Sequence, residues 1–579
     1  MSRNFKVPGR DLAIAGALLP LLLATPAAAQ YEPPKQMTLS PLGVDLSDGR
    51  FSYNATDLSI GPLALERSFL GGHTIDGSNY FGPNWTHNYA IYVVEKDRSH
   101  MDGIYVVLGR GTVHFTYSGG TYFCGHPDCE GAALTLVGGA FVYTDAQGNV
   151  YTFNPAVNAF PPPGNLTPAL RNQRVARIDY ADGHTLTYTY SGAQLRQISD
   201  NYGYSLVFEY SGSTNSISKA CGYNRAVTYV TTASTCAGAA LAVSYSYGAS
   251  GNVSNVLDVL GRNWGYDYGT VGMQLTCVRQ VDSSACQIAN VYASGGRPRE
   301  VSQQTTPDGA VWNYGYDPVD PDYIQLPGMP PPASGGNYSG PEGIGASALF
   351  GGGLLDYYSQ NGRLTYLQWD GVELSRLYYP EGNNVSYTYR AGQKTSEAWE
   401  AKPGSGIATI GTSTGFAEDP VFSALDRCPT LPRKICNKPI WKKDFRQNQT
   451  DFTYDSTHGG LLTETGPAAA NGVRPQTRYE YAQKRAWVNN GGGYAPEAVS
   501  IYLPVKKSFC ATGAASGAGC AIAGDEVVTT YDYGPDSGPN NLLLRSETVT
   551  AGGVTRRTCY GYDWQGNRIS TTRPNGLCQ

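Results

Sequence analysis

A short phrase of alternating residues recurs along the chain and constrains its fold more than any other feature. It reads Thr or an apolar residue, any residue, an aromatic residue, any residue, Tyr, and we identify nine copies of it between residues 186 and 562. Alternation places one set of side chains on one face of a β-strand. The intervening positions are mostly small or polar, so only one face of each strand carries rings. The nine copies are Leu186/Tyr188/Tyr190, Leu206/Phe208/Tyr210, Val243/Tyr245/Tyr247, Trp264/Tyr266/Tyr268, Trp312/Tyr314/Tyr316, Val385/Tyr387/Tyr389, Thr477/Tyr479/Tyr481, Thr529/Tyr531/Tyr533 and Thr558/Tyr560/Tyr562.

Turns centred on glycine separate the phrases, and Asp-Gly and Asn-Gly supply the positive φ that tight hairpins need. The repeating unit is therefore a β-hairpin of roughly 20 residues, which must stack on its neighbours to bury its face. We predict an all-β fold: an N-terminal β module followed by a curved or spiral sheet of stacked hairpins, with no amphipathic helix of three turns after residue 30. The turns are Asp182-Gly183-His184, Gly261-Arg262-Asn263, Asp308-Gly309-Ala310, Asn361-Gly362-Arg363 and Gly566-Asn567-Arg568.

The composition agrees with turn-rich β structure. Of 579 residues, 71 are Gly and 43 are Tyr, and only 15% are charged, whereas helical proteins rely on Ala, Leu, Glu and Lys. The 42 Lys and Arg against 47 Asp and Glu give a net charge of −5, so the chain has no basic footprint for nucleic acid.

The length predicts several domains or a long repeat array, because a domain usually holds about 100 to 200 residues. A Pro-rich stretch that ends in Gly351-Gly352-Gly353 reads as a linker or insertion, and residues 401–444 lack the phrase. A domain break at the Pro-rich stretch is the alternative. The predicted organisation is a signal peptide at 1–29, an N-terminal β module at 30–170, repeats at 171–317, the Pro/Gly-rich segment at 318–353 and further repeats at 354–579 with an insertion near 401–444.

The first residues have the pattern of a secretory signal peptide. Arg3, Lys6 and Arg10 precede an apolar run, and small residues before Gln30 predict cleavage after Ala29. The alternative, a membrane anchor, would need about 20 apolar residues, and the run from 12 to 23 is shorter. We therefore predict a secreted protein, in the periplasm, at the cell surface or outside the cell, with no membrane span after cleavage.

Twelve cysteines in an exported chain predict disulfides before metal ligands. They fall into neighbours along the sequence, as local cross-links across hairpins or loops would give. Connectivity is an inference from this spacing alone. The predicted pairs are Cys124 with Cys129, Cys221 with Cys236, Cys277 with Cys286, Cys428 with Cys436, Cys510 with Cys520, and Cys559 with Cys578.

Two regions of the chain resemble RHS proteins. Tyr454-Asp455, and Tyr562-Asp563 followed by Gly566 and a short strand, resemble the YD repeat, which also occurs in animal teneurins and insecticidal toxin-complex subunits. The N-terminal region is similar to the module that precedes RHS repeats in bacterial exported proteins, through Val44-Asp45-Leu46, Gly49, Phe51, Asp57-Leu58, Leu65, Arg67-Ser68-Phe69 and the run from Phe81 to Tyr89. The resemblance implies a spiral β-shell that encloses polypeptide, commonly a toxic C-terminal domain.

The C-terminal end departs from that pattern. In the family such a domain is released by self-cleavage at a core motif that contains Pro and Asp. This sequence shows no such motif and no variable toxin domain before Gln579, so we expect either a truncated product or a repeat protein without a toxin, and we assign no toxin activity. The last hairpin is expected to leave unpaired backbone groups that pair with another chain or with further repeats. A Cys559–Cys578 bridge that folds the tail back over this edge is the alternative.

Two sites have metal-binding or catalytic residue types, and a structural role is expected at both. His87 is a candidate base or ligand, but no Ser or Cys partner can be named. Cys124, His126, Asp128 and Cys129 resemble a zinc half-site that lacks a second pair of ligands nearby, and a disulfide loop is favoured.

Two further patterns are weak. Ser413, within Gly411-Thr412-Ser413-Thr414-Gly415, matches the hydrolase elbow but lacks its strand-to-helix context. Asp317, Asp320 and Asp322 are candidate calcium ligands that fit a solvated turn better. The sequence therefore predicts no enzyme, no cofactor and no metal.

Two functions remain open. The first is a non-catalytic exported shell or surface-interaction protein, in which an enclosed or downstream-encoded effector polypeptide is the partner and which forms part of a toxin system. The second is an extracellular protein that binds cell-surface glycans by stacking sugars on exposed Tyr rows.

Overall fold

The computed structural model describes residues 39–46, 49–71, 80–96, 103–118, 120–124, 129, 131–155, 172–211, 216–270, 274–294, 299–316, 355–360, 363–370, 373–390, 393–420 and 428–572. The predicted signal peptide, the stretch 318–353 and Cys578 lie outside these residues. Within them, no helix is long and apolar enough to cross a membrane.

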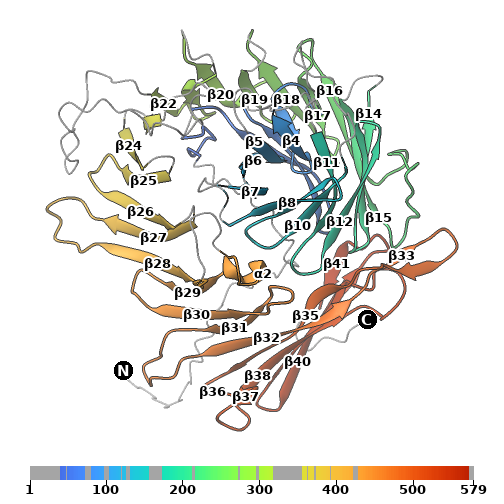
Figure 1. The fold of residues 1–579 in the computed structure, drawn as a ribbon, viewed down its shortest axis with the longest axis vertical. Coiled ribbons are helices and arrows are strands. Elements are labelled where there is room, and N and C mark those ends of the chain that lie inside the picture. Colours follow the sequence, from blue (N-terminus) through green and yellow to red (C-terminus); the bar gives the residue numbers. More distant parts are fainter. Residues whose placement is uncertain are drawn as a thin grey trace, which may run out of the picture. The chain divides into compact units, whose positions relative to one another are not determined.

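The described chain is nearly all β, as predicted, and most strands pair antiparallel with their neighbours in the sequence (Figure 1). A separate three-stranded sheet comes first, with β1 (Tyr53–Ile60), β2 (Leu63–Phe69) and β3 (Trp85–His87). The next strands are β4 (Ile91–Lys96), β5 (Gly103–Leu108), β6 (Gly111–Ser118), β7 (Thr121–Phe123), β8 (Ala133–Val137), β9 (Ala140–Thr144) and β10 (Val150–Phe153).

A long ladder of consecutive hairpins follows, and its strands β11 to β22 precede residue 317. They are β11 (Asn172–Asp179), β12 (Thr185–Ser191), β13 (Gln194–Asp200), β14 (Tyr204–Tyr210), β15 (Ile217–Asn224), β16 (Leu241–Tyr247), β17 (Val253–Leu257), β18 (Asn263–Tyr268), β19 (Leu275–Arg279), β20 (Cys286–Tyr292), β21 (Val301–Thr305) and β22 (Val311–Tyr316). β11 also pairs with both β4 and β10, which joins the earlier strands to the ladder.

The ladder continues from β22 directly to β23, on the far side of the Pro-rich stretch. Its later strands are β23 (Leu355–Gln360), β24 (Arg363–Asp370), β25 (Glu373–Tyr378), β26 (Asn384–Arg390), β27 (Gln393–Glu400), β28 (Ile410–Phe416), β29 (Pro439–Lys443), β30 (Gln449–Tyr454), β31 (Leu461–Thr465), β32 (Gln476–Lys484), β35 (Ile501–Cys510), β38 (Glu526–Tyr533), β39 (Leu544–Ala551), β40 (Val554–Tyr562) and β41 (Arg568–Thr571). Two small hairpins branch from it, β33 (Trp487–Asn489) with β34 (Tyr494–Pro496) and β36 (Ala515–Ser516) with β37 (Gly519–Cys520).

Residues 401–444 contain two ladder strands, β28 and β29. Between them lies the one helix of the described residues, the single turn α2 (Arg433–Cys436). The sheet therefore runs through this part of the chain, and only the segment around α2 stands off the ladder. The domain boundaries stay predictions.

Glycine turns join the hairpins as the sequence predicts. Gly183, Gly261, Gly309 and Gly566 have φ between +76° and +92°, a region that L side chains rarely adopt. Acidic residues fix these turns: the Asp563 carboxylate accepts hydrogen bonds from the Asn567 backbone N–H at 2.8 Å and from the Asn567 side chain at 2.9 Å. The Asp of this Tyr-Asp pair is thus a turn residue.

Hairpin ends far apart in sequence meet, and this brings late strands against early ones. The Tyr502 N–H donates to the Asp182 carbonyl at 2.9 Å, and the Asn224 side chain donates to the Asn540 side chain at 2.7 Å. These contacts connect the ends of β11–β15 with the segment from β30 to β41.

Candidate interaction surface

The structure places the rings of the nine phrases on one face of the ladder, which we call the aromatic face. The pairing register shows this directly: Tyr188 pairs with Ile198, which pairs with Leu206 on the same face as Phe208. The same alternation continues from β12 to β41 without a change of face. The prediction that the rings of the phrases share one face is confirmed, and other strands place rings such as Tyr357 and Trp441 on the opposite face.

A tenth phrase was missed in the sequence. Thr450, Phe452 and Tyr454 match the pattern, and Phe452 pairs with Glu464, which pairs with Thr477 of the next phrase. Its alternation was signal enough to find it.

A bulge recurs just before the last Tyr of each phrase. Where the structure describes the side chain of that Tyr, its hydroxyl bonds a backbone carbonyl of the neighbouring strand, and Tyr292, which belongs to no phrase, makes the same bond. In each case the acceptor is a backbone carbonyl on the preceding strand of the ladder. The acceptor residue itself pairs with the last ring of the strand before it, at the bulge there, as Leu195 does with Tyr190. These tyrosines are therefore structural clamps, and their hydroxyls are already occupied. The bonds run from Tyr190 to Val175 (3.0 Å), Tyr210 to Leu195 (2.8 Å), Tyr247 to Ile217 (2.5 Å), Tyr268 to Val253 (2.6 Å), Tyr292 to Leu275 (3.0 Å), Tyr389 to Leu374 (3.0 Å), Tyr454 to Pro439 (3.0 Å), Tyr481 to Leu461 (3.1 Å), Tyr533 to Pro504 (2.9 Å) and Tyr562 to Leu544 (2.8 Å).

The first half of the aromatic face is covered by the chain's own residues 39–46, 49–71 and 80–90, which we call the cover segment. The backbone of the cover segment binds the ladder at bulge positions. At these positions a strand N–H donates to the cover segment and not to the adjacent strand. The N–H groups of Ile217, Val253 and Val301 donate to the carbonyls of Tyr80 (2.8 Å), Phe81 (3.0 Å) and Gly49 (2.9 Å).

Side chains of the cover segment bind the middle rings of the phrases. Arg67, fully buried, donates from Nε to Asp57 at 3.0 Å and from a terminal nitrogen to the Tyr266 hydroxyl at 2.9 Å. The Tyr245 hydroxyl donates to the same Asp57 carboxylate at 2.9 Å. The Arg67 guanidinium also lies over the rings of Trp85 (4.4 Å) and Tyr266 (4.9 Å). A buried ion pair with this many partners fixes where the cover segment sits on the sheet.

His87 belongs to this covered interface. Its side chain is fully buried, with its ring centroid 4.7 Å from that of Tyr80, 5.9 Å from Phe81 and 6.0 Å from Phe208. Burial lowers the pKa of His87 to about 3, so the imidazole is neutral. Neither ring nitrogen has a hydrogen-bond partner among the described residues. This environment of rings fits the expected structural role and provides no group for a base to activate.

The second half of the aromatic face, from β26 to β41, is more open than the first, although Val385 at its start is fully buried. The middle rings Tyr188, Tyr245, Tyr266 and Tyr314 of the first half are buried, whereas their counterparts in the second half are only half-buried. Large apolar side chains on the same face are exposed here. The half-buried rings are Tyr387, Tyr479, Tyr531 and Tyr560, and the exposed neighbours include Ile410 (49%), Phe509 (37%), Val549 (38%) and Val554 (60%).

The cysteines form five disulfides within the described residues, between the same neighbours that the spacing indicates, and no described cysteine is free. Cys124 is bonded to Cys129, so these two sulfurs are not zinc thiolates, while His126 and Asp128 lie outside the described residues. The sixth predicted pair involves Cys578, which also lies outside them.

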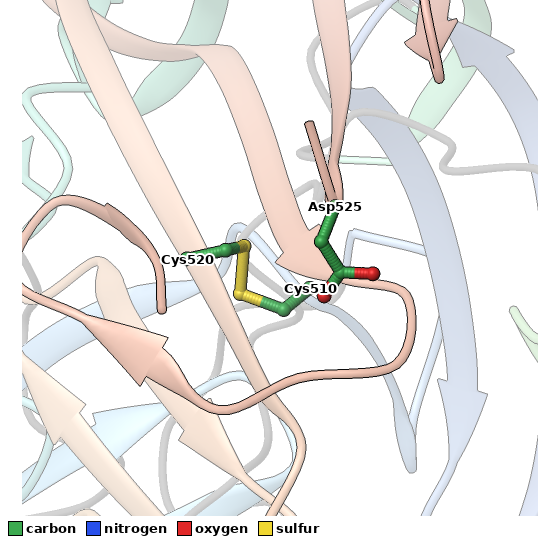
Figure 2. Close-up of side chains that lie close together, drawn as sticks. All are labelled: Cys510, Cys520 and Asp525. Atoms are coloured by element: carbon green, nitrogen blue, oxygen red, sulfur yellow. A yellow bond between two sulfur atoms is a disulfide. The ribbon is translucent and has the colours of Figure 1, made fainter. Parts of the chain in front are cut away.

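Cys510, Cys520 and Asp525 come close enough together to suggest a metal site, but Figure 2 shows the two sulfurs joined to each other. The Asp525 carboxylate instead accepts hydrogen bonds from the Thr512 hydroxyl (2.7 Å) and the Gly513 N–H (2.7 Å), which lower its pKa. This group is a loop clamp.

Ser413 lies within β28, paired with Ser396 and Lys443, and not at a strand-to-helix turn. Gly415 pairs with Trp441 on this side of the sheet, opposite the aromatic face. The elbow geometry is therefore absent at Ser413. The candidate calcium ligands Asp317, Asp320 and Asp322 lie outside the described residues.

No protein-family model matches the chain, and no match is found among curated proteins. Among solved structures, similarity extends to TcdB2-TccC3 (10% identity, 90% of this chain and 27% of that chain, TM-score 0.32) and to TcdB2-TccC3 without its hypervariable C-terminal region (10%, 87% and 26%, 0.32). A Photorhabdus luminescens Tc holotoxin pore matches at 11% identity over 90% of this chain and 27% of that chain, with a TM-score of 0.33. The chain spans about a quarter of the length of these chains. TM-scores this low do not place the chain in a family.

Proposed function

We propose that this chain is a non-catalytic, exported β-scaffold of the RHS type, which holds polypeptide against its aromatic face. The observation that carries the proposal is the unequal cover of that face. The first half is occupied by residues 39–46, 49–71 and 80–90 of the chain itself, and the second half presents the same kind of surface with its rings and aliphatic side chains open to solvent.

The covered half supports the choice of polypeptide as the ligand class. There the face binds backbone carbonyls through strand N–H groups and binds an Asp–Arg pair through Tyr hydroxyls, as between Asp57 and Tyr245 at 2.9 Å. A sugar-binding surface would use Tyr hydroxyls as hydrogen-bond donors. The hydroxyls of the last Tyr of the phrases already donate to carbonyls within the ladder. The signal-peptide pattern of residues 1–29 supports export.

Site-specific photocrosslinking in the cells that export the chain tests the proposal. A benzoylphenylalanine at Tyr531 would lie on the open face, and one at Asp532 would lie on the opposite face of the same strand. We expect protein adducts at position 531 and few at position 532. Equal adducts at both positions, or adducts at 531 that glycosidases remove and proteases do not, would contradict a polypeptide-binding role.

A further inference from the structure

We propose that the open half of the aromatic face, β26 to β41, binds an acidic, apolar-rich polypeptide of a second chain. This inference rests on the proposed function and adds the chemistry of the partner. It follows from three features of the open half: the source of the cations over its rings, the surplus of cations on it, and its exposed aliphatic side chains.

The cations over the middle rings come from different places in the two halves. In the covered half, the cation over Tyr266 is Arg67, which belongs to the cover segment. In the open half, the ladder itself supplies them: Lys394 lies 5.2 Å from the centroid of Tyr387, Lys507 lies 5.8 Å from Tyr479, and Arg568 lies 5.0 Å from Tyr560. A polypeptide that binds the open half therefore meets cations that the ladder already holds over its rings. The group on that polypeptide that complements these cations is a carboxylate.

The open half carries more cations than acids, although the chain has a net charge of −5. Glu397 is already bound by Lys394 at 2.8 Å. Lys507 and Arg556 face the same side as the rings and make no salt bridge among the described residues. The register and ring contacts place on this face the cations Lys394, Lys442, Lys507, Arg545, Arg556 and Arg568, against the acids Glu397, Glu464 and Glu547.

The opposite face of the same strands shows the contrast. There Lys506 binds Glu480 at 2.7 Å and Arg557 binds Asp532 at 3.0 Å. On these two strands the outer-face cations Lys506 and Arg557 are paired with acids of the chain, whereas their neighbours Lys507 and Arg556 on the aromatic face make no salt bridge among the described residues and are left to a partner.

The exposed aliphatic side chains require apolar groups in the occupant. Phe509 pairs with the apolar Val527, and Val549 pairs with the cationic Arg556, so apolar side chains lie both beside each other and beside a cation on this face. In the covered half, strand N–H groups at the bulges donate to backbone carbonyls of the cover segment. Two of the corresponding positions in the open half are Pro439 and Pro504, which have no N–H to donate. The occupant is held by side chains, with carboxylates on the cations and aliphatic groups between them.

Fluorescence anisotropy with three synthetic peptides tests this. The probes are labelled peptides of about 10 residues, too short to form a stable helix alone: one of Glu, Leu and Ser, one with each Glu replaced by Lys, and one with each Leu replaced by Ser. We expect the chain to bind only the Glu/Leu peptide saturably, and more weakly as NaCl rises from about 50 to 500 mM. Better binding of the Lys peptide, or equal binding of the peptide without Leu, overturns the proposal.

Two double variants with the same change in charge provide the matched comparison. Lys507→Glu with Arg556→Glu alters the aromatic face, and Lys506→Glu with Arg557→Glu alters the outer face one residue away in each strand. We expect the first double variant to weaken binding of the Glu/Leu peptide at least about tenfold, and the second to change that binding less than about twofold. Equal losses in both variants overturn the proposal.

A third variant tests the same face if the double variant Lys507→Glu with Arg556→Glu does not fold. Val554→Glu places a carboxylate at an exposed position of the same face and should also weaken the Glu/Leu peptide, and unchanged binding counts against the proposal. The crosslinking at Tyr531 separates the two claims. Protein adducts there without a preference for the Glu/Leu peptide refute the acidic partner alone, whereas missing adducts refute the proposed function.

Discussion

At the scale of single residues, the covered interface depends on groups that water cannot reach. Arg67 and Asp57 are buried together, and His87 is buried among rings with no polar partner in the described chain. These groups hold the cover segment on the ladder in one charge state each: Arg67 and Asp57 as an ion pair, and His87 as a neutral imidazole. Stability should therefore respond to loss of a partner and to pH.

Removal of the Arg67 side chain tests the buried ion pair. Arg67→Met leaves the Asp57 carboxylate buried without its cation, so the free energy of unfolding should fall by about 3 to 5 kcal/mol. Arg177→Ala, at the partly exposed pair with Asp179, is the control and should cost no more than about 1 kcal/mol. Urea unfolding measures both, and equal losses would mean that Arg67 does not anchor the cover segment.

His87 predicts a loss of stability in acid. Its pKa is about 3 in the folded chain and near 6.5 when unfolded, so the unfolded state takes up the proton first as pH falls. The His87 contribution is intact above pH 6.5 and is lost as pH falls toward 3, by about 2 kcal/mol at pH 5. His87→Phe should remove this part of the difference between urea unfolding at pH 7 and pH 5. If both proteins lose the same stability over that interval, the imidazole is not buried as described.

At the scale of elements, the hairpin repeats through two tyrosines with different roles. The last Tyr of each phrase closes a hydrogen bond across the bulges, and the middle ring faces outward from the sheet toward the cover segment or solvent. Tyr531 and Tyr533 show the two roles on one strand, since Tyr533 donates to the Pro504 carbonyl and Tyr531 lies half-buried on the open face.

Substitution of these two tyrosines should separate the roles. Tyr533→Phe deprives the Pro504 carbonyl of its donor and should lower the free energy of unfolding by about 1 to 2 kcal/mol. Tyr531→Phe should change it by less than about 0.5 kcal/mol, as surface substitutions usually do. Urea titration of both variants is the check, and a larger effect at Tyr531 would reverse the assignment.

The hairpins were predictable because their signals are local. Alternation places the rings on one face, glycine marks the turns, and near neighbours among the cysteines are bonded, as with Cys221 and Cys236. The bulge clamp was not predictable, because the hydroxyl of Tyr389 bonds the Leu374 backbone carbonyl on the neighbouring strand, and side-chain alternation does not identify a backbone acceptor. Nor was the cover: the contact of Arg67 with Tyr266 spans 199 residues, and no periodic signal links them.

At the scale of the whole molecule, one aromatic face serves two purposes. Its first half holds residues 39–46, 49–71 and 80–90, and its second half keeps rings, cations and aliphatic side chains within reach of a partner. The resemblance to RHS sequences implies an enclosed polypeptide, and the contacts of the cover segment show how this face takes one. The same repeat thus builds a core in one half and, in the proposed function, a binding surface in the other.

Hydroxyl-radical footprinting of the native chain, resolved by mass spectrometry to single tyrosines, tests this division most directly. The account predicts that Tyr479 and Tyr531 are oxidised faster than Tyr245 and Tyr266 in the free chain. It also predicts that the Glu/Leu peptide slows oxidation of the first two and leaves the other two unchanged. Tyr479 and Tyr531 as slow as Tyr245 in the free chain would contradict an open half.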